Sequence, residues 1–204
     1  MIISHTNKFI FFKSTKSAST STEVFFEQFC DKDKDIIGWR GLKKNIPKDV
    51  EYWHHMKPKG IKAKVSLEQW KTYLKFGGIR NPWDRVVSTY FFKKDHIGSI
   101  PDNISFEHYV KHLKHLHPVS FYTYYGMDEL QEDYKYNMYF IRYENLYQDI
   151  LNICDMLNLK PKDNLIHCHK SDRDTDYKTY YNEETKQIIE KRYGHDIRLF
   201  NYKY

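Results

Sequence analysis

Short apolar runs that alternate with helical patterns are the feature that most constrains how this 204-residue chain folds. The runs Lys8–Lys13, Phe76–Ile79 and Met138–Ile141 have the length of buried strands. Each precedes a segment whose apolar residues recur every three or four positions, as in a helix that packs on a sheet. Alternation of this kind favours crossover connections between parallel strands. The sequence therefore predicts a single α/β domain over residues 1–204, with a central, mainly parallel sheet flanked by helices.

Capping residues predict where these helices begin. Thr20 and Glu23 have the spacing of a capping box, and so do Ser66 and Gln69, which precede a stripe of Leu67, Trp70 and Leu74. Asn81, followed by Pro82 and Asp84, predicts a third helix start with Trp83, Val86, Val87, Tyr90 and Phe91 facing inward. Further helices are expected at 105–116, after Met138–Ile141, and at about 183–193, followed by an aromatic tail.

Composition is that of a globular protein with a positive net charge. Hydrophobic residues make up 40% of the chain, and the formal net charge of +6 favours an anionic ligand. A nucleotide, a polyanionic glycan, nucleic acid and an anionic membrane all fit that charge. Three widely spaced cysteines without a CxxC pattern indicate reduced thiols. The chain shows neither a secretory leader nor an apolar run of about 18 residues, so we expect no membrane span and a cytoplasmic location.

The segment Lys13–Ser21 (KSTKSASTS) is the first candidate site. A loop of small residues that leads into a helix presents unpaired N–H groups and the positive end of the helix dipole to an anion. Lys16 adds a positive charge, and the side chains of Ser17, Ser19, Thr20 and Ser21 add hydroxyl groups. The loop lacks the glycines and the lysine position of a Walker A motif. The alternative is an ordinary serine-rich turn that binds nothing.

The segment Gly78–Phe92 is the second candidate site. Arg80 follows a strand and Ser88 lies about 7–8 Å along the next helix at 1.5 Å per residue. Both side chains could therefore hold one phosphate, with Arg as the charged donor and Ser as a directed hydrogen bond. The alternative is that Arg80 and Arg85 pair with Asp84 or with other acids.

These two segments together resemble the sulfotransferases that use 3′-phosphoadenosine 5′-phosphosulfate (PAPS). Lys13–Ser21 resembles their 5′-phosphosulfate loop, although Thr15 stands where the family usually has Pro. Ile79–Tyr90 (IRNPWDRVVSTY) is similar to their 3′-phosphate motif, and Ile141–Leu146 and Lys191–Tyr202 are similar to later family segments. The ASTS of the loop is most similar to the carbohydrate branch, which includes uronosyl 2-O-sulfotransferases and small bacterial relatives.

The resemblance implies a P-loop-like sulfotransferase fold and transfer of a sulfuryl group from PAPS to a hydroxyl acceptor, an anionic or neutral carbohydrate. Lys16 is then catalytic, since it stabilises the leaving oxygen. The implied donor-binding residues are Lys16, Ser17, Ala18, Ser19, Thr20, Ser21, Arg80 and Ser88, with Arg173 and Tyr177 from a late segment that resembles the one covering the nucleotide.

The resemblance also suggests His55 as the general base that accepts the acceptor's proton. His54 is one residue away and Glu51 is a further alternative. We expect no metal, because Lys16 can serve the leaving group. His108, His112 and His115 lie on one helical stripe, and we interpret them as a basic, solvent-facing surface in preference to a metal site.

Other functions remain open at the level of sequence. The chain could be an inactive module that binds PAPS or a polyanion, or a sulfotransferase for tyrosyl-protein or small-molecule acceptors. A kinase-like or nucleoside triphosphate-hydrolysing protein is disfavoured by the absence of a Walker A loop. We expect no nucleic-acid partner, and the sequence makes no prediction of the oligomeric state.

Overall fold

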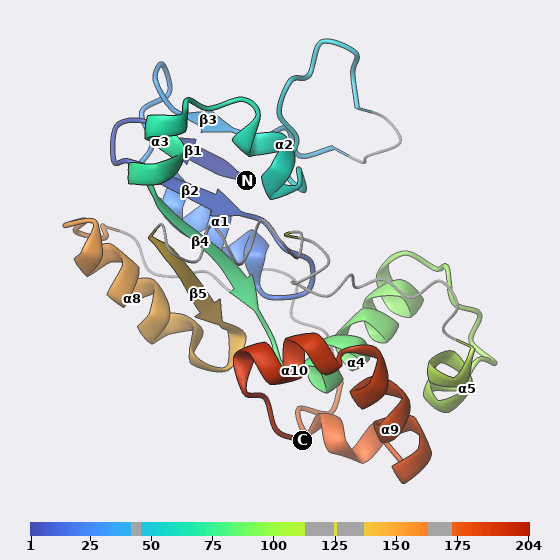
Figure 1. Cartoon of the computed structure of the whole chain (residues 1–204). Coiled ribbons are helices and arrows are strands. Elements are labelled where there is room, and N and C mark those ends of the chain that lie inside the picture. The colour runs from blue at the N-terminus through green and yellow to red at the C-terminus, as the bar shows by residue number, and fades with distance from the viewer. Residues whose placement is uncertain (42–45, 113–124, 126–136, 163–172) are drawn as a thin grey trace. The chain divides into compact units, whose positions relative to one another are not determined.

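The computed structural model describes residues 1–41, 46–112, 125, 137–162 and 173–204. The chain divides into two compact units (Figure 1). The first comprises Met1–Ile79 and Thr123–Cys168, and the second comprises Arg80–Tyr122 and His169–Tyr204. The first unit contains the sheet, and the elements described in the second are helical. The expectation of one domain over residues 1–204 stays a prediction.

A five-stranded sheet in the order β3-β1-β2-β4-β5 forms the centre of the first unit. β2 (Phe9–Phe12) pairs in parallel with β4 (Leu74–Ile79), and β4 pairs in parallel with β5 (Met138–Arg142). β1 (Ile2–Ser4) is antiparallel to β2 and to β3 (Ile36–Ile37). The predicted α/β fold with a central sheet is therefore confirmed, and the three predicted strands form its parallel part.

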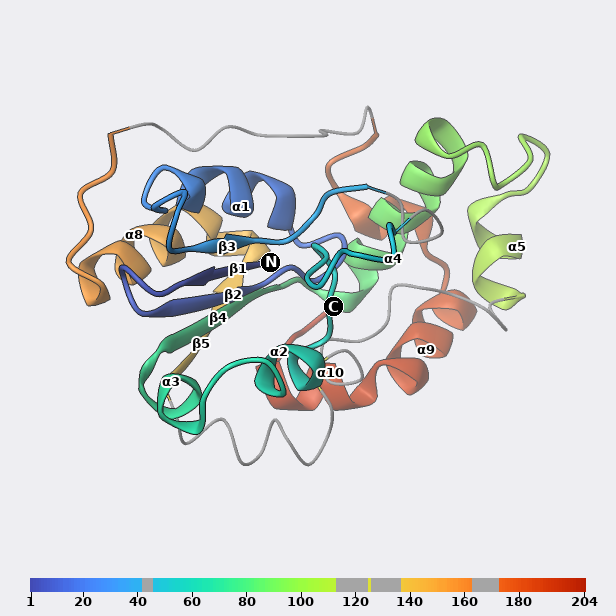
Figure 2. The same cartoon turned by 90° about the horizontal axis from the view of Figure 1, so that it is seen from above.

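Helices cover both faces of this sheet. Figure 2 shows α1 (Ser19–Glu27) and α8 (Leu146–Met156) on one side of it, with α2 (Pro58–Lys62) and α3 (Leu67–Thr72) on the other. Phe12 of β2 packs against Trp70 of α3, with ring centroids 6.1 Å apart. Alternate strand residues face α1 and α8, and their buried cluster contains Phe9, Phe11, Phe25, Phe26, Phe76, Ile141, Ile150 and Ile153.

The start of α3 is as predicted, but its stripe is not. Ser66 and Gln69 form the expected capping box. Leu67, however, is 65% exposed, and the helix ends at Thr72. Leu74 instead joins the sheet, because its N–H donates to the carbonyl of Lys8 at 2.9 Å. Pairing with a neighbouring strand here outweighs the helical spacing of the apolar residues.

The amino-terminal strand β1 was missed at the sequence level. Ile2 and Ile3 are fully buried and pair with β2 and β3. The polar residues His5–Lys8 form the turn between β1 and β2. Asp35 stabilises that turn by accepting hydrogen bonds from the N–H groups of His5 (2.6 Å) and Thr6 (2.9 Å). The distant partner Asp35 is what the local pattern could not reveal.

The second unit packs around α4 (Pro82–Phe91), whose predicted start is confirmed. Asn81 caps the helix by accepting from the N–H of Trp83 at 3.0 Å. α4 continues into the π-helical turn η2 (Phe92–His96). The other described helices of this unit are α5 (Phe106–Lys111), η4 (Tyr177–Tyr180), α9 (Glu183–Arg192) and α10 (Gly194–Phe200). Their buried cluster contains Trp83, Val86, Val87, Tyr90, Phe106, Val110, Ile189 and Tyr193.

Part of the predicted aromatic tail is the helix α10, which the sequence analysis missed. The residues predicted to extend the α5 helix beyond position 112 lie outside the described part of the chain. None of the helices in the described part combines the length and the apolarity needed to cross a bilayer.

Candidate functional site

The loop Lys13–Ser21 connects β2 to α1 and has an unusual backbone. Lys16 (φ 60°) and Ala18 (φ 55°) both adopt the left-handed conformation, which non-glycine residues rarely adopt. Ala18 occupies the N-cap of α1 and has no side chain with which to cap the helix. The predicted Thr20–Glu23 capping box is wrong, because α1 begins at Ser19 and Glu23 is buried in an ion-pair cluster.

The N-terminus of α1 therefore presents free backbone donors. Within the described ranges, no acceptor receives a hydrogen bond from the N–H groups of Ser17, Ala18, Ser19 or Thr20. The positive end of the helix dipole acts at the same place. Consecutive N–H groups beside left-handed residues form a concave arrangement of the kind that binds anions. This backbone is compatible with the anion site predicted for the loop, which stays a prediction.

Serine hydroxyls hold this loop against β4. The hydroxyl of Ser14 lies 2.7 Å from that of Ser17 and donates to the carbonyl of Gly78 at 2.5 Å. The hydroxyl of Ser19 donates to the carbonyl of Ser14, also at 2.5 Å. A Cβ at Gly78 would lie 2.5 Å from the Ser17 hydroxyl oxygen, so only glycine fits there. The hydroxyls of Ser17 and Ser19 thus shape the loop, and the sequence analysis missed the contributions of Ser14 and Gly78.

His55 lies beside the first residue of this loop. Its Nδ1 is 2.8 Å from the carbonyl oxygen of Lys13. Because a carbonyl only accepts, Nδ1 must carry the hydrogen, which leaves Nε2 as the basic nitrogen of the neutral ring. Burial lowers the pKa of His55, although the hydrogen bond to Lys13 acts in the opposite direction. The ring is thus neutral near pH 7 with a defined tautomer.

The two alternatives to His55 differ from it in their surroundings. The ring of His54 contacts that of His55, with centroids 4.3 Å apart. Burial, followed by the nearby His55 and Lys13, lowers the pKa of His54 to about 4. Glu51 is exposed and pairs with Lys64 at 2.8 Å. Of the three, His55 is the one that the structure joins by a hydrogen bond to the loop.

In the second unit, Asp84 joins two of the predicted arginines. Its carboxylate accepts from Nε of Arg80 at 2.7 Å and from Nη2 of Arg173 at 2.5 Å. All three side chains are largely buried. The pairing of Arg80 with Asp84 that the sequence left open is therefore present. Two guanidinium groups therefore share one carboxylate.

Tyr177 and Ser88 lie near the two ends of α4. The hydroxyl of Tyr177 accepts from the side-chain amide of Asn81, the N-cap residue, at 3.3 Å. Burial raises the pKa of Tyr177, and the charge of Asp84 raises it further. Ser88 lies one helical turn beyond Asp84 and is largely buried. The structure thus gathers Arg80, Arg173 and Tyr177 about the start of α4.

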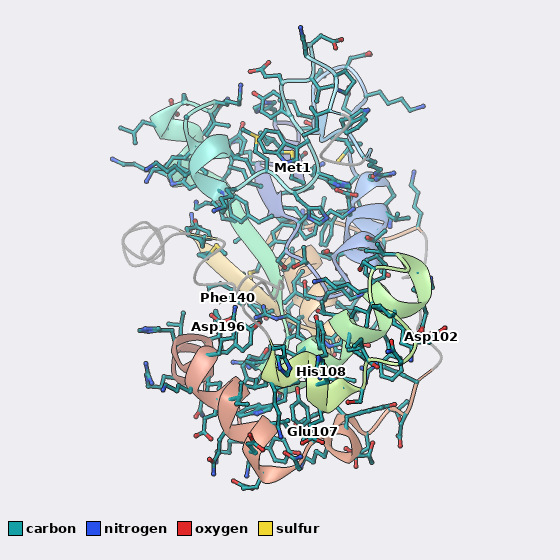
Figure 3. All side chains as sticks on the ribbon, turned by 90° about the vertical axis from the view of Figure 1, so that its right-hand side faces the viewer. Met1, Asp102, Glu107, His108, Phe140 and Asp196 are labelled. Atoms are coloured by element: carbon teal, nitrogen blue, oxygen red, sulfur yellow. The ribbon has the colours of Figure 1, made fainter. Side chains whose placement is uncertain are left out.

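Arg85 is bound elsewhere in this unit. Its Nη2 lies 3.4 Å from the carboxylate of Asp196 on α10, and its guanidinium lies over the ring of Tyr193. Figure 3 labels Asp196 on that helix. These contacts give Arg85 a role in packing the unit.

The histidine stripe is a surface feature of α5. The rings of His108 and His112 stack with centroids 4.0 Å apart, and both residues are exposed. Figure 3 shows His108 and its neighbour Glu107 on this helix. His115 lies outside the described residues. In the described part of the chain, no three His, Cys, Asp or Glu side chains are grouped so as to hold a metal ion.

Comparisons with known proteins agree with the fold. Among solved structures, the chain is similar to the crystal structure of mouse sulfotransferase SULT7A1 complexed with PAP. The two share 13% sequence identity with a TM-score of 0.58, over 95% of this chain and 85% of that chain. No curated protein sequence matches. A family model, the Sulfotransferase family, matches residues 1–203. Since that match spans nearly all of the 204 residues, the chain belongs to the sulfotransferase family.

Proposed function

We propose that this protein transfers a sulfuryl group from PAPS to a hydroxyl group of a carbohydrate. The observation that carries the proposal is the uncapped start of α1, where the N–H groups of Ser17–Thr20 follow Lys16 in an anion-binding backbone. Family membership supports sulfuryl transfer as the reaction. The carbohydrate acceptor rests on the resemblance of the loop to that branch of the family and on the net charge of +6.

The loop in the first unit is proposed to hold the 5′-phosphosulfate. Backbone N–H groups of Ser17–Thr20 donate to its oxygens, and Lys16 stabilises the negative charge that develops on the oxygen bridging to sulfur as that bond breaks. The acceptor oxygen forms the new bond to sulfur, and the nucleotide leaves as the 3′,5′-diphosphate PAP. Because Lys16 stabilises the leaving oxygen, the proposed reaction does not require a metal ion.

Four residues of the second unit are proposed to recognise the adenosine 3′-phosphate. Arg80 supplies a charged donor and Ser88 a neutral one. Asp84 fixes the guanidinium of Arg80 and also holds Arg173. Tyr177, hydrogen-bonded to the cap residue of α4, completes the set. This cluster would distinguish PAPS from nucleotides without a 3′-phosphate.

His55 is proposed to be the general base. The hydrogen bond from Nδ1 to Lys13 leaves Nε2 able to take the proton from the acceptor hydroxyl as that oxygen attacks. Its lowered pKa keeps the ring neutral at the pH where the base must be ready.

The direct test is sulfate transfer from radiolabelled PAPS to a panel of carbohydrate, tyrosyl-peptide and phenol acceptors, with Lys16→Ala as the central variant. We expect wild-type protein to label carbohydrates.

Lys16→Ala should retain the fold and lose about 10²–10³ in turnover, as for loss of an oxyanion donor. A positive φ at position 16 costs Lys and Ala about the same, so the substitution does not alter the backbone preference of the loop. Exposed Lys32→Ala is the charge control. Wild-type turnover in Lys16→Ala would remove its role.

Calorimetry with PAP and AMP tests the 3′-phosphate cluster. Arg80→Ala should weaken PAP binding by about 1.5–3 kcal/mol and Ser88→Ala by about 1 kcal/mol, as expected for a charge-assisted and a neutral hydrogen bond. AMP lacks the 3′-phosphate, so its affinity should stay unchanged. Arg198→Ala, an exposed arginine on α10, controls for charge. Equal losses for PAP and AMP would contradict the assignment.

The pH dependence of turnover tests the base. The active form of His55 is neutral, so turnover should hold above its pKa and fall as the pH drops through it. Since burial lowers that pKa, the midpoint of the acid limb should lie below the ordinary histidine value of about 6.5. His55→Gln should lose most of its turnover, and the remaining turnover should no longer fall at acidic pH. His54→Gln should keep the wild-type turnover and the wild-type pH profile. An unchanged pH profile in His55→Gln would show that another group is the base.

A further inference from the structure

Glu23 is a buried carboxylate that the proposed reaction does not use. It lies within α1 with a fully buried side chain. Three nitrogen groups surround it: the amino group of Met1 at 2.6 Å, Nζ of Lys13 at 2.7 Å and Nε of Arg40 at 3.2 Å. Burial lowers the pKa of the Met1 amino group to about 5, so the charged partners near pH 7 are Lys13 and Arg40. Burial alone would raise the pKa of Glu23, but the amino group and Lys13 outweigh it and lower that pKa. The carboxylate is therefore ionised and fully paired.

Each of these three groups belongs to a segment that holds His54 or His55 in place. The carbonyl of Lys13 accepts from Nδ1 of His55 at 2.8 Å. The amino group of Met1 donates to the carbonyl of His54 at 2.9 Å. Arg40 follows Trp39, whose carbonyl accepts from the N–H of His54 at 2.9 Å. Three separate connections to the two histidines therefore converge on one carboxylate.

The histidines have little other support from secondary structure. His54 and His55 lie in a turn that follows the isolated bridge between Trp39 and Trp53 and precedes α2 at Pro58. A residue in such a turn is positioned by the contacts of its neighbours, because no helix or strand fixes it. A buried ion pair adds little net stability, since desolvation offsets its attraction. The role of this ion pair is better explained by the position that it fixes.

We propose that Glu23 is the positioning residue for the general base: its carboxylate fixes Lys13, Arg40 and the amino-terminal residue so that the turn carrying His55 stays beside the phosphosulfate loop. This inference rests on the proposed function. It assigns Glu23 no contact with the donor or the acceptor, so its effect should fall on turnover and on the titration of His55 while PAP affinity stays unchanged.

The sign of the titration effect follows from the groups around His55. These are the ring of His54, the ammonium of Lys13, the amino terminus and the carboxylate of Glu23. Glu23 is the acid among them, and its charge favours the protonated imidazole. Removing that charge leaves the ammonium of Lys13 unopposed, and a loosened turn also weakens the hydrogen bond to Lys13. Both changes move the protonation of His55 to lower pH.

The experiment compares wild-type protein with Glu23→Gln, which keeps the shape of the side chain and removes its charge. Three quantities are measured: the NMR titration midpoint of His55, PAP affinity by calorimetry, and the rate of PAP release from PAPS with water as the acceptor. We expect a lower midpoint, unchanged PAP affinity and a loss of about 10- to 100-fold in PAP release, since small misplacements of catalytic groups cost rates of this order.

Asp149→Asn is the matched control. Asp149 is another largely buried carboxylate of the first unit, on α8, where it accepts from the N–H of Arg142 at 2.7 Å. Asp149→Asn should lower the melting temperature of the protein. It should leave the titration midpoint of His55 and the rate of PAP release per folded molecule at their wild-type values. Equal effects of the two variants on rate and midpoint would overturn the positioning role of Glu23.

The remaining outcomes separate the inference from the proposed function. A wild-type midpoint and rate in Glu23→Gln would overturn the inference while leaving sulfuryl transfer intact. If wild-type protein releases no PAP, the proposed function fails, and the His55 midpoint still decides whether Glu23 positions the turn. If Glu23→Gln does not fold, Glu23→Asp decides. It keeps the charge but is one methylene shorter, so we expect slower PAP release with a nearly unchanged midpoint, and a wild-type rate would overturn the inference.

Discussion

The interaction on which the first unit depends is the buried ion pair between Lys13 and Glu23. Lys13 directly follows β2 and begins the proposed anion-binding loop, so its side chain, its carbonyl and its chain neighbours serve three purposes at once. The ammonium pairs with Glu23, the carbonyl orients His55, and the following residues present backbone donors at the start of α1. Desolvation makes such a pair costly, so its benefit lies in geometry. A buried charge thereby links the core of the unit to its proposed chemistry.

The second unit uses the same physical device. There one carboxylate, Asp84, fixes two guanidinium groups at the start of α4. Arginine is suited to this arrangement because one edge of its planar group can bind a carboxylate while other N–H groups remain directed elsewhere. Each unit thus contains a set of proposed anion-binding groups held in place by a buried acid. Positioning by fixed charges is the main contribution that a protein can make to a transfer reaction of this kind.

Local signals in the sequence predicted the parts of the fold that depend on neighbouring residues. The Ser66 capping box, the Asn81 cap and the strands β2, β4 and β5 are all encoded within a few positions. Features that depend on distant partners were missed, including β1, the contact of Gly78 with the loop, and the ion pairs of Glu23. Glu23 was misassigned because its spacing from Thr20 fits a cap, whereas its partners are 10 to 22 residues away. The candidate site residues were predicted from the order and spacing of the two motifs and from their resemblance to the family.

The central claim is that the open start of α1 binds the donor nucleotide, and hydrogen exchange of individual backbone amides tests it most directly. Exchange should be followed with and without PAP at a concentration that saturates binding by calorimetry. The account predicts that PAP slows exchange at Ser17, Ala18, Ser19 and Thr20, whose N–H groups have no acceptor in the described structure, and leaves the amides of α8 unchanged. Binding of PAP with no change in exchange at those four amides would contradict the account.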